Sequence, residues 1–290
     1  MFSRIARQVR RFLLGSLLLT LSMWAALAQG LMDWPSDMAV SPLSALAWAI
    51  TLTLVIGIPV ALLALLMPAL LPTVELLLIT LLLLALLDAP LRIALGAEVL
   101  PGWVSCAVLV IVFIGVERAL YGPWLCRVWR RDMARKTSRF HAQVSPEKAW
   151  RALFPDPAHV GDFYWSEASF LAAPEGSAAD FILNLPRRGG YKNTLAAVTI
   201  EAAEPEQYFR YRTQPLPGSG DPAQIIEVRI APDGVGRSQI TYSEQNLDVA
   251  FGQRLFFYLN HGFRDTLASL RARLDGRKDR SIQGQQMLRS

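Results

Sequence analysis

Residues Ser145–Pro157, SPEKAWRALFPDP, decide the class of fold expected for the second half of the chain. Ser145 is suited to cap a helix, and Pro146 suits the first helical position, where no backbone N–H donor is needed. Apolar residues then recur on one helical face: Ala149, Trp150 and Leu153. Asp156-Pro157 predicts the start of a second short helix. This pattern is typical of a soluble domain, although the chain before it is strongly apolar.

The two halves of the chain differ in composition. Of 290 residues, 52% are hydrophobic, and the apolar excess falls within residues 1–126. Residues 1–136 carry 11 Lys/Arg and 7 Asp/Glu, a net charge of +4, whereas residues 137–290 carry 18 and 17, a net charge of +1. The near-neutral second half gives no reason to expect a nucleic-acid partner. Cys106 and Cys126 lie in or beside apolar segments, and two such cysteines make no disulfide framework.

Residues 1–126 are predicted to form an α-helical transmembrane region of about four spans. A hydrocarbon core about 30 Å thick needs roughly 20 apolar residues of helix. Three segments reach that length, and another stops short at Asp88 and Pro90, although it can extend beyond a kink. In chain order the segments are Phe12–Met32, Leu43–Met67, Val74–Leu87 and Trp103–Leu125. Arginines precede the first and follow the last, which predicts that both ends are cytoplasmic.

Three further expectations concern the membrane. The first segment also fits a cleavable signal peptide, because a basic start and an apolar run precede Ala-Leu-Ala, and this alternative stays open. Glu75 and Glu117 lie near predicted segment ends, so an interfacial role is favoured over transport. The chain has 25 Arg and only 4 Lys, with abundant Ala and Leu, which suggests a GC-rich bacterial source. The expected location is therefore the bacterial inner membrane.

Residues 127–136 are predicted to be a basic helical stem that continues the fourth span. The stretch LCRVWRRDMARK, residues 125–136, contains neither Gly nor Pro and carries four arginines. Each basic residue near anionic lipid contributes on the order of 1 kcal/mol. Such a stem would hold the following domain at a fixed height above the headgroups.

From Ser138 onward the pattern becomes alternating, which predicts seven short strands. They are SRFHAQV (138–144), SEASFLAA (166–173), ADFILNLP (179–186), TLAAVTIEAAEP (194–205), EQYFRYRTQP (206–215), AQIIEVRIAP (223–232) and ITYSEQNL (240–247). One face of these strands is expected to be buried: Phe140, Ala142, Val144, Phe181, Leu183, Leu185, Phe209, Tyr211, Ile226, Val228, Ile230, Ile240 and Tyr242.

The last predicted element is a long helix at about Val249–Leu274. An apolar stripe recurs along it at spacings of four and three residues, which indicates one buried helical face. The stripe consists of Phe251, Leu255, Leu259, Phe263, Leu267, Leu270 and Leu274.

This order of elements resembles the START-like or SRPBCC superfamily, whose helix-grip fold wraps a curved antiparallel sheet on a long C-terminal helix. The resemblance rests on Ser145–Trp150 after a strand, Glu204-Pro205-Glu206 between strands, Ala231–Gly234 before the final strand, and the closing helix with Leu267-x-x-Leu270. It covers about residues 137–276. It implies an α+β domain at 137–278 with a polar tail at 279–290, and an apolar chamber between helix and sheet. It implies no shared catalytic motif.

Eight residues are candidates to contact a ligand in that chamber: Trp165, Phe170, Phe181, Phe209, Tyr211, Tyr242, Phe256 and Phe263. Glu244 shares the inner face with Tyr242. If Glu244 is buried, its pKa should rise; a solvated strand end is the alternative. The three histidines, His141, His159 and His261, are scattered, so neither a metal nor a cofactor is predicted. Residues 187–190, RRGG, are expected to form a solvated hairpin turn.

The function favoured by the sequence is a membrane-anchored cytoplasmic protein that binds an apolar, lipid- or quinone-like small molecule. Its partners would be that ligand and the membrane lipids. A structural or regulatory component of a membrane assembly, with a membrane protein as partner, is the alternative. A cyclase- or hydrolase-type enzyme using Tyr242, Glu244 or His261 is less favoured, because no converging acid–base pair is evident.

Overall fold

The computed structural model describes isolated positions between residues 13 and 58, and then residues 71–96, 102–120, 130–187, 193–217, 221–281 and 283–284. The chain divides into two compact units, Met1–Val128 and Trp129–Ser290. Each unit is described by itself.

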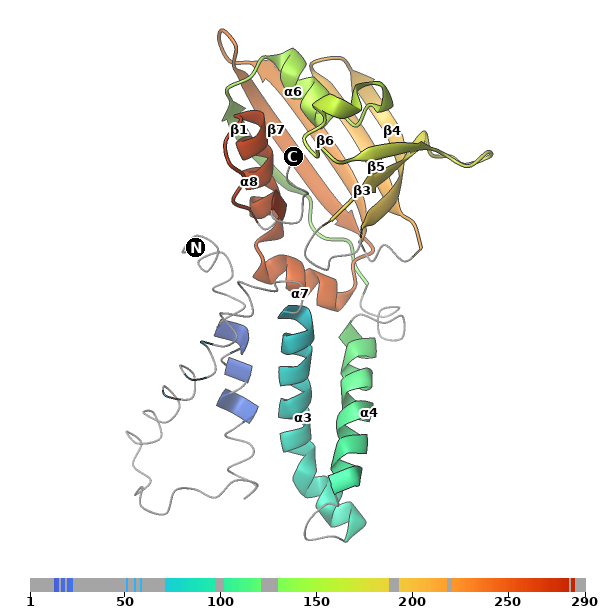
Figure 1. Ribbon diagram of the computed structural model, residues 1–290, viewed down its shortest axis with the longest axis vertical. Helices are drawn as coiled ribbons and strands as arrows, with labels where there is room; N and C mark the ends of the chain where they lie inside the picture. The colour runs from blue at the N-terminus through green and yellow to red at the C-terminus, as the bar shows by residue number, and fades with distance from the viewer. Residues whose placement is uncertain are drawn as a thin grey trace. The chain divides into compact units, whose positions relative to one another are not determined.

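The first unit contains two described helices that lie side by side (Figure 1), α3 at Leu71–Leu95 and α4 at Gly102–Leu120. Within the described residues, one helix, at Trp103–Leu120, is long and apolar enough to cross a membrane. The prediction of about four spans is therefore not supported. Its first two segments fall largely outside the described residues. The third was expected to be able to extend beyond Pro90, and α3 does continue through that proline to Leu95.

The second unit is built on one seven-stranded antiparallel sheet, as predicted. The strands are β1 (Lys136–Ala142), β2 (Ser169–Ala172), β3 (Phe181–Leu185), β4 (Thr194–Glu204), β5 (Tyr208–Pro215), β6 (Ala223–Pro232) and β7 (Ser238–Leu247). Their order across the sheet is β1-β7-β6-β5-β4-β3-β2. The first strand thus pairs with the last, which brings residues about a hundred positions apart onto one surface.

The opening stretch forms the two short helices that the sequence predicts. Helix α6 spans Pro146–Leu153, and the Ser145 side chain accepts a hydrogen bond from the Lys148 N–H at 3.4 Å. A 3-10 helix, η2, follows at Pro157–Asp162, with Asp156 accepting from the Ala158 N–H at 2.9 Å. These caps satisfy N–H groups that have no partner within the helix. Both helices lie at the end of the sheet farthest from α7 (Figure 1).

The predicted single helix at Val249–Leu274 is two helices, which corrects the sequence analysis. Helix α7 spans Phe251–Leu259 and α8 spans Gly262–Leu274. His261 between them has a φ of 50°, which no continuous α-helix allows. Gly262 packs so closely on the Phe257 ring that a Cβ there would overlap with it. The apolar stripe is therefore divided between two helices, and only its α8 part crosses the sheet.

The predicted helical stem is also wrong over residues 130–136, while 127–129 lie outside the described residues. Arg131 forms an antiparallel bridge with Val249, through N–H···O distances of 3.3 and 3.1 Å. The Met133 N–H donates to the Asn246 carbonyl at 2.8 Å, and β1 begins at Lys136. In this segment, backbone hydrogen bonds to residues at and just after the end of β7 form in place of an α-helix. Residues 130–136 therefore form no helical stem that could set the domain's height.

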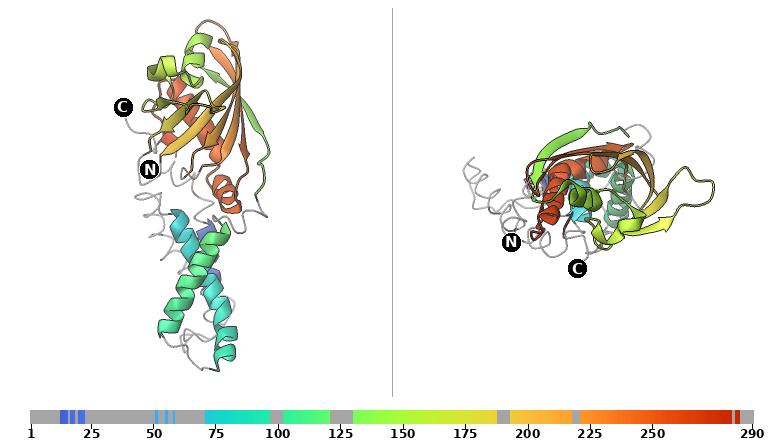
Figure 2. Two further views of the ribbon diagram at one scale, coloured as in Figure 1. Left: turned by 90° about the vertical axis from the view of Figure 1, so that its right-hand side faces the viewer. Right: turned by 90° about the horizontal axis from the view of Figure 1, so that it is seen from above.

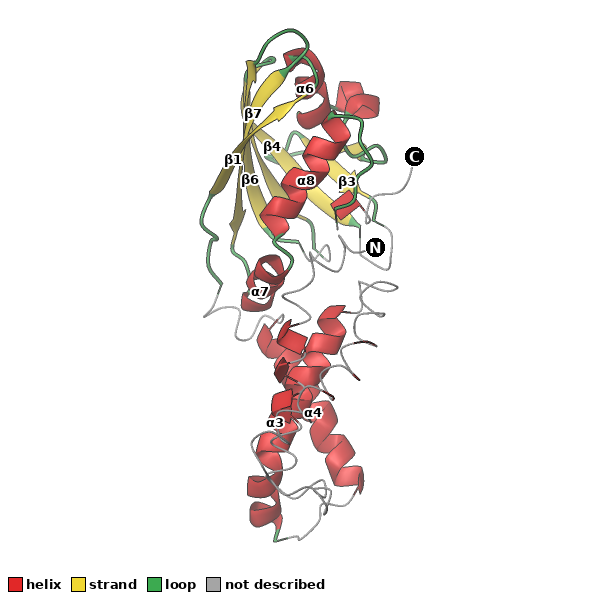
Figure 3. Ribbon diagram, turned by 90° about the vertical axis from the view of Figure 1, so that its left-hand side faces the viewer, coloured by secondary structure: helices red, strands yellow, loops and turns green. Residues whose placement is uncertain are grey.

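The core lies between α8 and the concave face of the sheet. Figure 3 shows α8 crossing this face, and the right panel of Figure 2 shows the sheet curving around it. Four α8 residues join the inner strand residues in one buried cluster: Phe263, Leu267, Leu270 and Leu274. The predicted inner faces of β1, β3, β5, β6 and β7 are confirmed, with Leu185 half-buried at the margin.

Candidate functional site

The predicted aromatic ligand contacts fall mostly within this core. Trp165, Phe181, Phe209, Tyr211, Tyr242 and Phe263 belong to the buried cluster, and Phe170 packs against it. Phe256 is half-buried on α7 and is not part of the cluster. Within the cluster, the ring centroids of Phe209 and Tyr211 are 6.0 Å apart, and those of Tyr242 and Phe263 are 6.1 Å apart. The structure thus brings six of the eight together; their contact with a ligand stays a prediction.

A buried carboxyl group interrupts this apolar interior. Strand register places Tyr211 of β5, Ile226 of β6 and Glu244 of β7 in one row across the sheet. Glu244 is only 5% exposed. Its Oε2 accepts a hydrogen bond from the Tyr242 hydroxyl at 3.3 Å, and its Oε1 accepts from Asn246 Nδ2 at 3.0 Å. The sequence left open whether this strand end is solvated, and the structure shows it buried.

Burial controls the protonation of Glu244. Loss of hydration disfavours the charged form and raises the pKa of this carboxyl, although hydrogen bonds from Asn246 and Tyr242 and the charge of Lys136 act in the opposite direction. A carboxyl kept neutral is both a hydrogen-bond donor and an acceptor. In its protonated form, Glu244 can bind a ligand oxygen as an O–H donor.

Three tyrosines interact electrostatically with this carboxyl, and one of them, Tyr242, contacts it. Burial raises the pKa of Tyr211 and Tyr242 well above its ordinary value, and the nearby Glu244 raises both further. The ring of Tyr164 is half-buried, yet desolvation of its hydroxyl raises the pKa of Tyr164 to about 12. All three therefore stay protonated at neutral pH. Their hydroxyls are hydrogen-bond donors in an otherwise apolar core, and that of Tyr242 donates to Glu244.

Asn246 extends the polar network along the sheet. Its Oδ1 accepts from Gln224 Nε2 of β6 at 2.8 Å, and both residues face the same side as Glu244. Near this end, Arg187 pairs with Asp221 at 3.3 Å, and Asp221 also accepts from the Thr194 hydroxyl. Arg187 was expected in a solvated turn, but its side chain is only 22% exposed, and its charge lowers the pKa of Tyr164. Residues 188–190 lie outside the described residues.

Sequence reasoning missed Tyr164, Asn246 and Arg187 as members of this site. Tyr164 follows η2 rather than lying on a strand, so no alternation indicates where its hydroxyl points. Asn246 does share the inner-face period of β7 with Tyr242 and Glu244, and that signal was available. The buried position of Arg187 depends on Asp221, 34 residues later.

The histidines make no site together. His141 pairs with Asp233 at 2.7 Å and His159 with Asp156 at 2.8 Å, both at the surface. His261 precedes α8. In the part of the chain that the structure describes, no cluster of three or more His, Cys, Asp or Glu side chains is arranged to hold a metal ion.

The second unit is thus an α+β domain with one helix packed across a curved antiparallel sheet, which fits the helix-grip class. No protein-family model and no curated protein matches the sequence. Among solved structures, protein MLL2253 from Mesorhizobium loti is 19% identical, with 50% of this chain and 99% of that chain covered and a TM-score of 0.35. A protein from Arthrobacter aurescens is 11% identical over 50% of this chain and 88% of that chain, with a TM-score of 0.37.

The Aha1 dimer from Colwellia psychrerythraea is similar to the same degree. It is 16% identical, with 49% of this chain and 97% of that chain covered and a TM-score of 0.33. Similarities at this level carry no functional argument. The function has to be derived from the residues of this chain.

Proposed function

We propose that the second unit binds an apolar small molecule, lipid- or quinone-like, whose polar end lies against Glu244 and the surrounding tyrosines. One observation carries the proposal: a polar wall, formed by Glu244 with Tyr242 and Tyr211 on the sheet and by Tyr164 nearby, interrupts a core that is otherwise apolar. Leucines of α8 and the inner strand residues would contact the apolar body of the ligand. Hydroxyl donors at the polar wall would fix its orientation, as polar groups do in apolar ligand sites.

Stability alone does not account for this wall. Burying a polar group costs about 1–3 kcal/mol unless it is well paired, and a buried carboxyl costs more. Well-packed apolar side chains in such positions are often as stable or more stable. Buried ionisable groups with shifted pKa values are for this reason candidates for function. Glu244, Tyr242 and Tyr211 are best explained by a ligand group that they recognise.

Membrane anchoring is the second part of the proposal. The apolar segment Trp103–Leu120 ends ten residues before Arg130, where the second unit begins to be described. A membrane tether would keep the domain at high local concentration near a ligand that is almost insoluble in water. We place the protein in a bacterial inner membrane with this domain cytoplasmic, on the arginine distribution and the composition of the chain. Lipids of that membrane are then its immediate partners.

A second candidate function is acid catalysis, and the burial of Glu244 favours it. A carboxyl with a raised pKa can act as a general acid near neutral pH. Tyr242 would orient it through the 3.3 Å hydrogen bond. Turnover of a bound carbonyl compound that is lost in Glu244→Gln, with binding retained, would support catalysis over simple binding.

The experiment that tests ligand binding uses the full chain, purified from membranes in mild detergent. Solvent extraction and mass spectrometry of the wild type should recover one class of apolar molecule in near-stoichiometric amount. Glu244→Leu should lose it. Glu227→Leu is a matched control, because Glu227 is also buried but faces the opposite side of β6 and pairs with Arg135. If the wild type yields no apolar molecule and takes up neither a fluorescent lipid nor a quinone, a docking role in a membrane assembly becomes the better account.

A further inference from the structure

The chain reverses direction after α8. Gly276 has a φ of 64°, its N–H donates to the Arg273 carbonyl at 3.1 Å, and the Arg277 N–H donates to the Ala272 carbonyl at 2.7 Å. This pair of bonds is a Schellman motif, which ends a helix and turns the chain back along it. Residues 277–284, which we name the strap, therefore run back beside α8. Within the strap, residue 282 lies outside the described residues.

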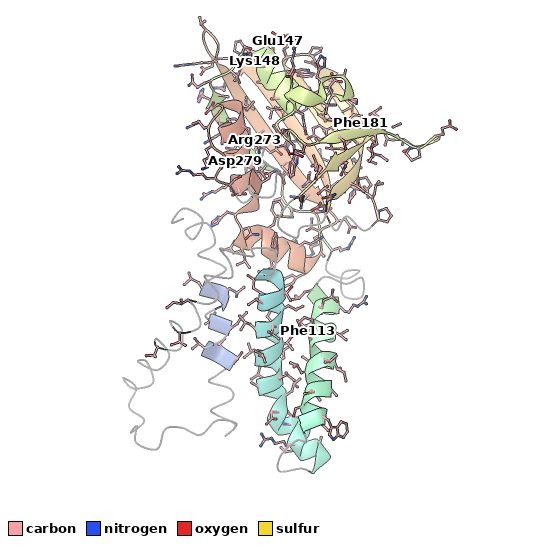
Figure 4. All side chains as sticks on the ribbon, viewed as in Figure 1. Phe113, Glu147, Lys148, Phe181, Arg273 and Asp279 are labelled. Atoms are coloured by element: carbon pink, nitrogen blue, oxygen red, sulfur yellow. The ribbon has the colours of Figure 1, made fainter. Side chains whose placement is uncertain are left out.

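One face of α8 holds the strap at positions four residues apart. Asp279 of the strap accepts from the Ser269 hydroxyl at 2.6 Å and lies 3.6 Å from Arg273 Nε. Figure 4 shows Arg273 on the last turn of α8 with Asp279 close by. One turn earlier than Ser269, Asp265 accepts from the Gln283 N–H at 2.8 Å. Residues expected to be a plain polar tail are thus docked on the helix that covers the site.

The strap reaches the polar wall. The Gln283 side chain contacts the Tyr164 hydroxyl and lowers its pKa, and Tyr164 is in turn close enough to Glu244 and Tyr211 to affect the titration of Tyr211. Asp279 also holds the strap in place, because it accepts from the Ser281 N–H at 2.9 Å and its side chain is only 7% exposed. The Gln283 amide therefore lies at the edge of the proposed ligand site, and Asp279 holds the strap on α8 four residues earlier.

Some buried polar atoms in and near the strap have no hydrogen bond. Gln283 Oε1, Arg187 Nε and Arg273 Nε are buried and have no hydrogen-bond partner among the described residues. Arg187 and Arg273 both act electrostatically on Tyr164. Each arginine already has a carboxylate beside it, Asp279 for Arg273 and Asp221 for Arg187, but in the described part of the chain neither Nε–H is hydrogen-bonded. An unpaired buried N–H is costly, and a carboxylate placed within hydrogen-bond distance is the acceptor that matches a guanidinium best.

We propose that the strap is an internal competitor for the ligand site, and that the ligand displacing it is an amphiphile with a carboxylate head. The head would take the place of Asp279 beside Arg273 and the buried Ser269 hydroxyl, and its apolar chain would lie under α8. This inference rests on the function proposed above and adds the chemistry of the head and a means of closing the site. In the closed state, Asp279 and Gln283 stand in for the polar atoms of the ligand.

Gly284 offers a way to open the strap without removing a polar group. A Cβ at Gly284 would overlap with the Asp279 carboxylate, which its hydrogen bonds hold in place. Gly284→Ala should therefore push Asp279 away from Arg273. Gly115→Ala in α4 is the matched control, because a Cβ there meets nothing within 4 Å.

The test measures binding of a fluorescent C16 carboxylic acid and of the matching C16 alcohol to the full chain in detergent. We expect the wild type to prefer the acid by about tenfold, which corresponds to about 1.4 kcal/mol. Gly284→Ala should bind the acid about tenfold more tightly than Gly115→Ala does. Arg273→Gln should lose the preference for the acid while still binding the alcohol. Equal binding of acid and alcohol by the wild type, or no change in Gly284→Ala, would overturn the proposal.

Hydrogen exchange reports the strap directly. The N–H groups of Ser281, Gln283 and Gly284 all donate within the described structure. Binding of the acid should speed the exchange of these N–H groups, and binding of the alcohol should not. The amides of β7 should stay protected in every variant, which would show that the fold is intact. Unchanged strap exchange with bound acid would contradict displacement. Failure of both probes to bind any variant would contradict the proposed function itself, which separates the two failures.

Discussion

The two ends of β7 are equally buried and chemically opposite. At one end Ile240 lies between Phe140 and Ile230 on the neighbouring strands, and all three are apolar. At the other end, four residues later, Glu244 and Asn246 face the same core. The apolar end stabilises the fold in the ordinary way, by removing hydrocarbon from water. The polar end stabilises it little or not at all, so burial by itself does not say what a residue is for.

The largest effect should come from the apolar contacts. Leu270→Ala removes a nearly fully buried α8 side chain from the core cluster. The free energy of unfolding should fall by about 2–5 kcal/mol, because the lost transfer energy and the new cavity add. Chemical denaturation followed by tryptophan fluorescence measures this loss. A loss below about 1 kcal/mol would mean that α8 does not seal the core as described.

A polar substitution at the other end should cost less. Asn246→Leu leaves the Gln224 amide without its acceptor and Glu244 Oε1 without its donor, so the free energy of unfolding should fall by about 1–3 kcal/mol. The same denaturation experiment applies. Gln245→Leu, on the opposite face of β7, is the control and should change stability by less than about 1 kcal/mol. Equal losses of stability in the two variants would contradict the different roles assigned to the two faces of β7.

The smallest effect is a difference in pH dependence between Glu244→Gln and the wild type. The folded-state pKa of Glu244 is raised above its ordinary value of 4.5, so the folded protein keeps a proton that the unfolded chain releases. The stability that this proton contributes is complete below about pH 4.5 and is lost as pH rises through the folded pKa. Glu244→Gln does not titrate there, so its stability should gain on the wild type as pH rises. A constant difference from pH 4 to pH 8 would show that Glu244 is not desolvated.

Much of the fold follows from local pattern. Period-two alternation identifies all seven strands and the buried faces of most of them, and Ser145 with Pro146 fixes the start of α6 because caps are local chemistry. The break at His261 was missed because the apolar stripe continues across it at helical spacing. The stem at residues 130–136 was assigned to helix from the lack of Gly and Pro, but its backbone pairs with Val249 and Asn246 more than a hundred residues away.

The site was less accessible from the sequence than the fold. Its aromatic wall is visible in the alternation of β5 and β7, where Tyr211 and Tyr242 fall on the inner face. The protonation of Glu244 depends on desolvation, which only three-dimensional packing determines. The strap has a polar composition that predicts a solvated tail, and only the turn at Gly276 directs it onto α8.

The central claim is that the polar end of the core recognises a ligand. Its most direct test is the affinity of the full chain for a fluorescent apolar probe in the wild type and in a Tyr211→Phe, Tyr242→Phe double variant. Two lost hydroxyl donors should weaken binding about tenfold or more, since hydrogen bonds contribute roughly 0.5–1.5 kcal/mol each. Tyr208→Phe with Tyr258→Phe is the control, because Tyr208 is only half-buried and Tyr258 is exposed. Equal affinity in the wild type and the double variant would contradict the claim.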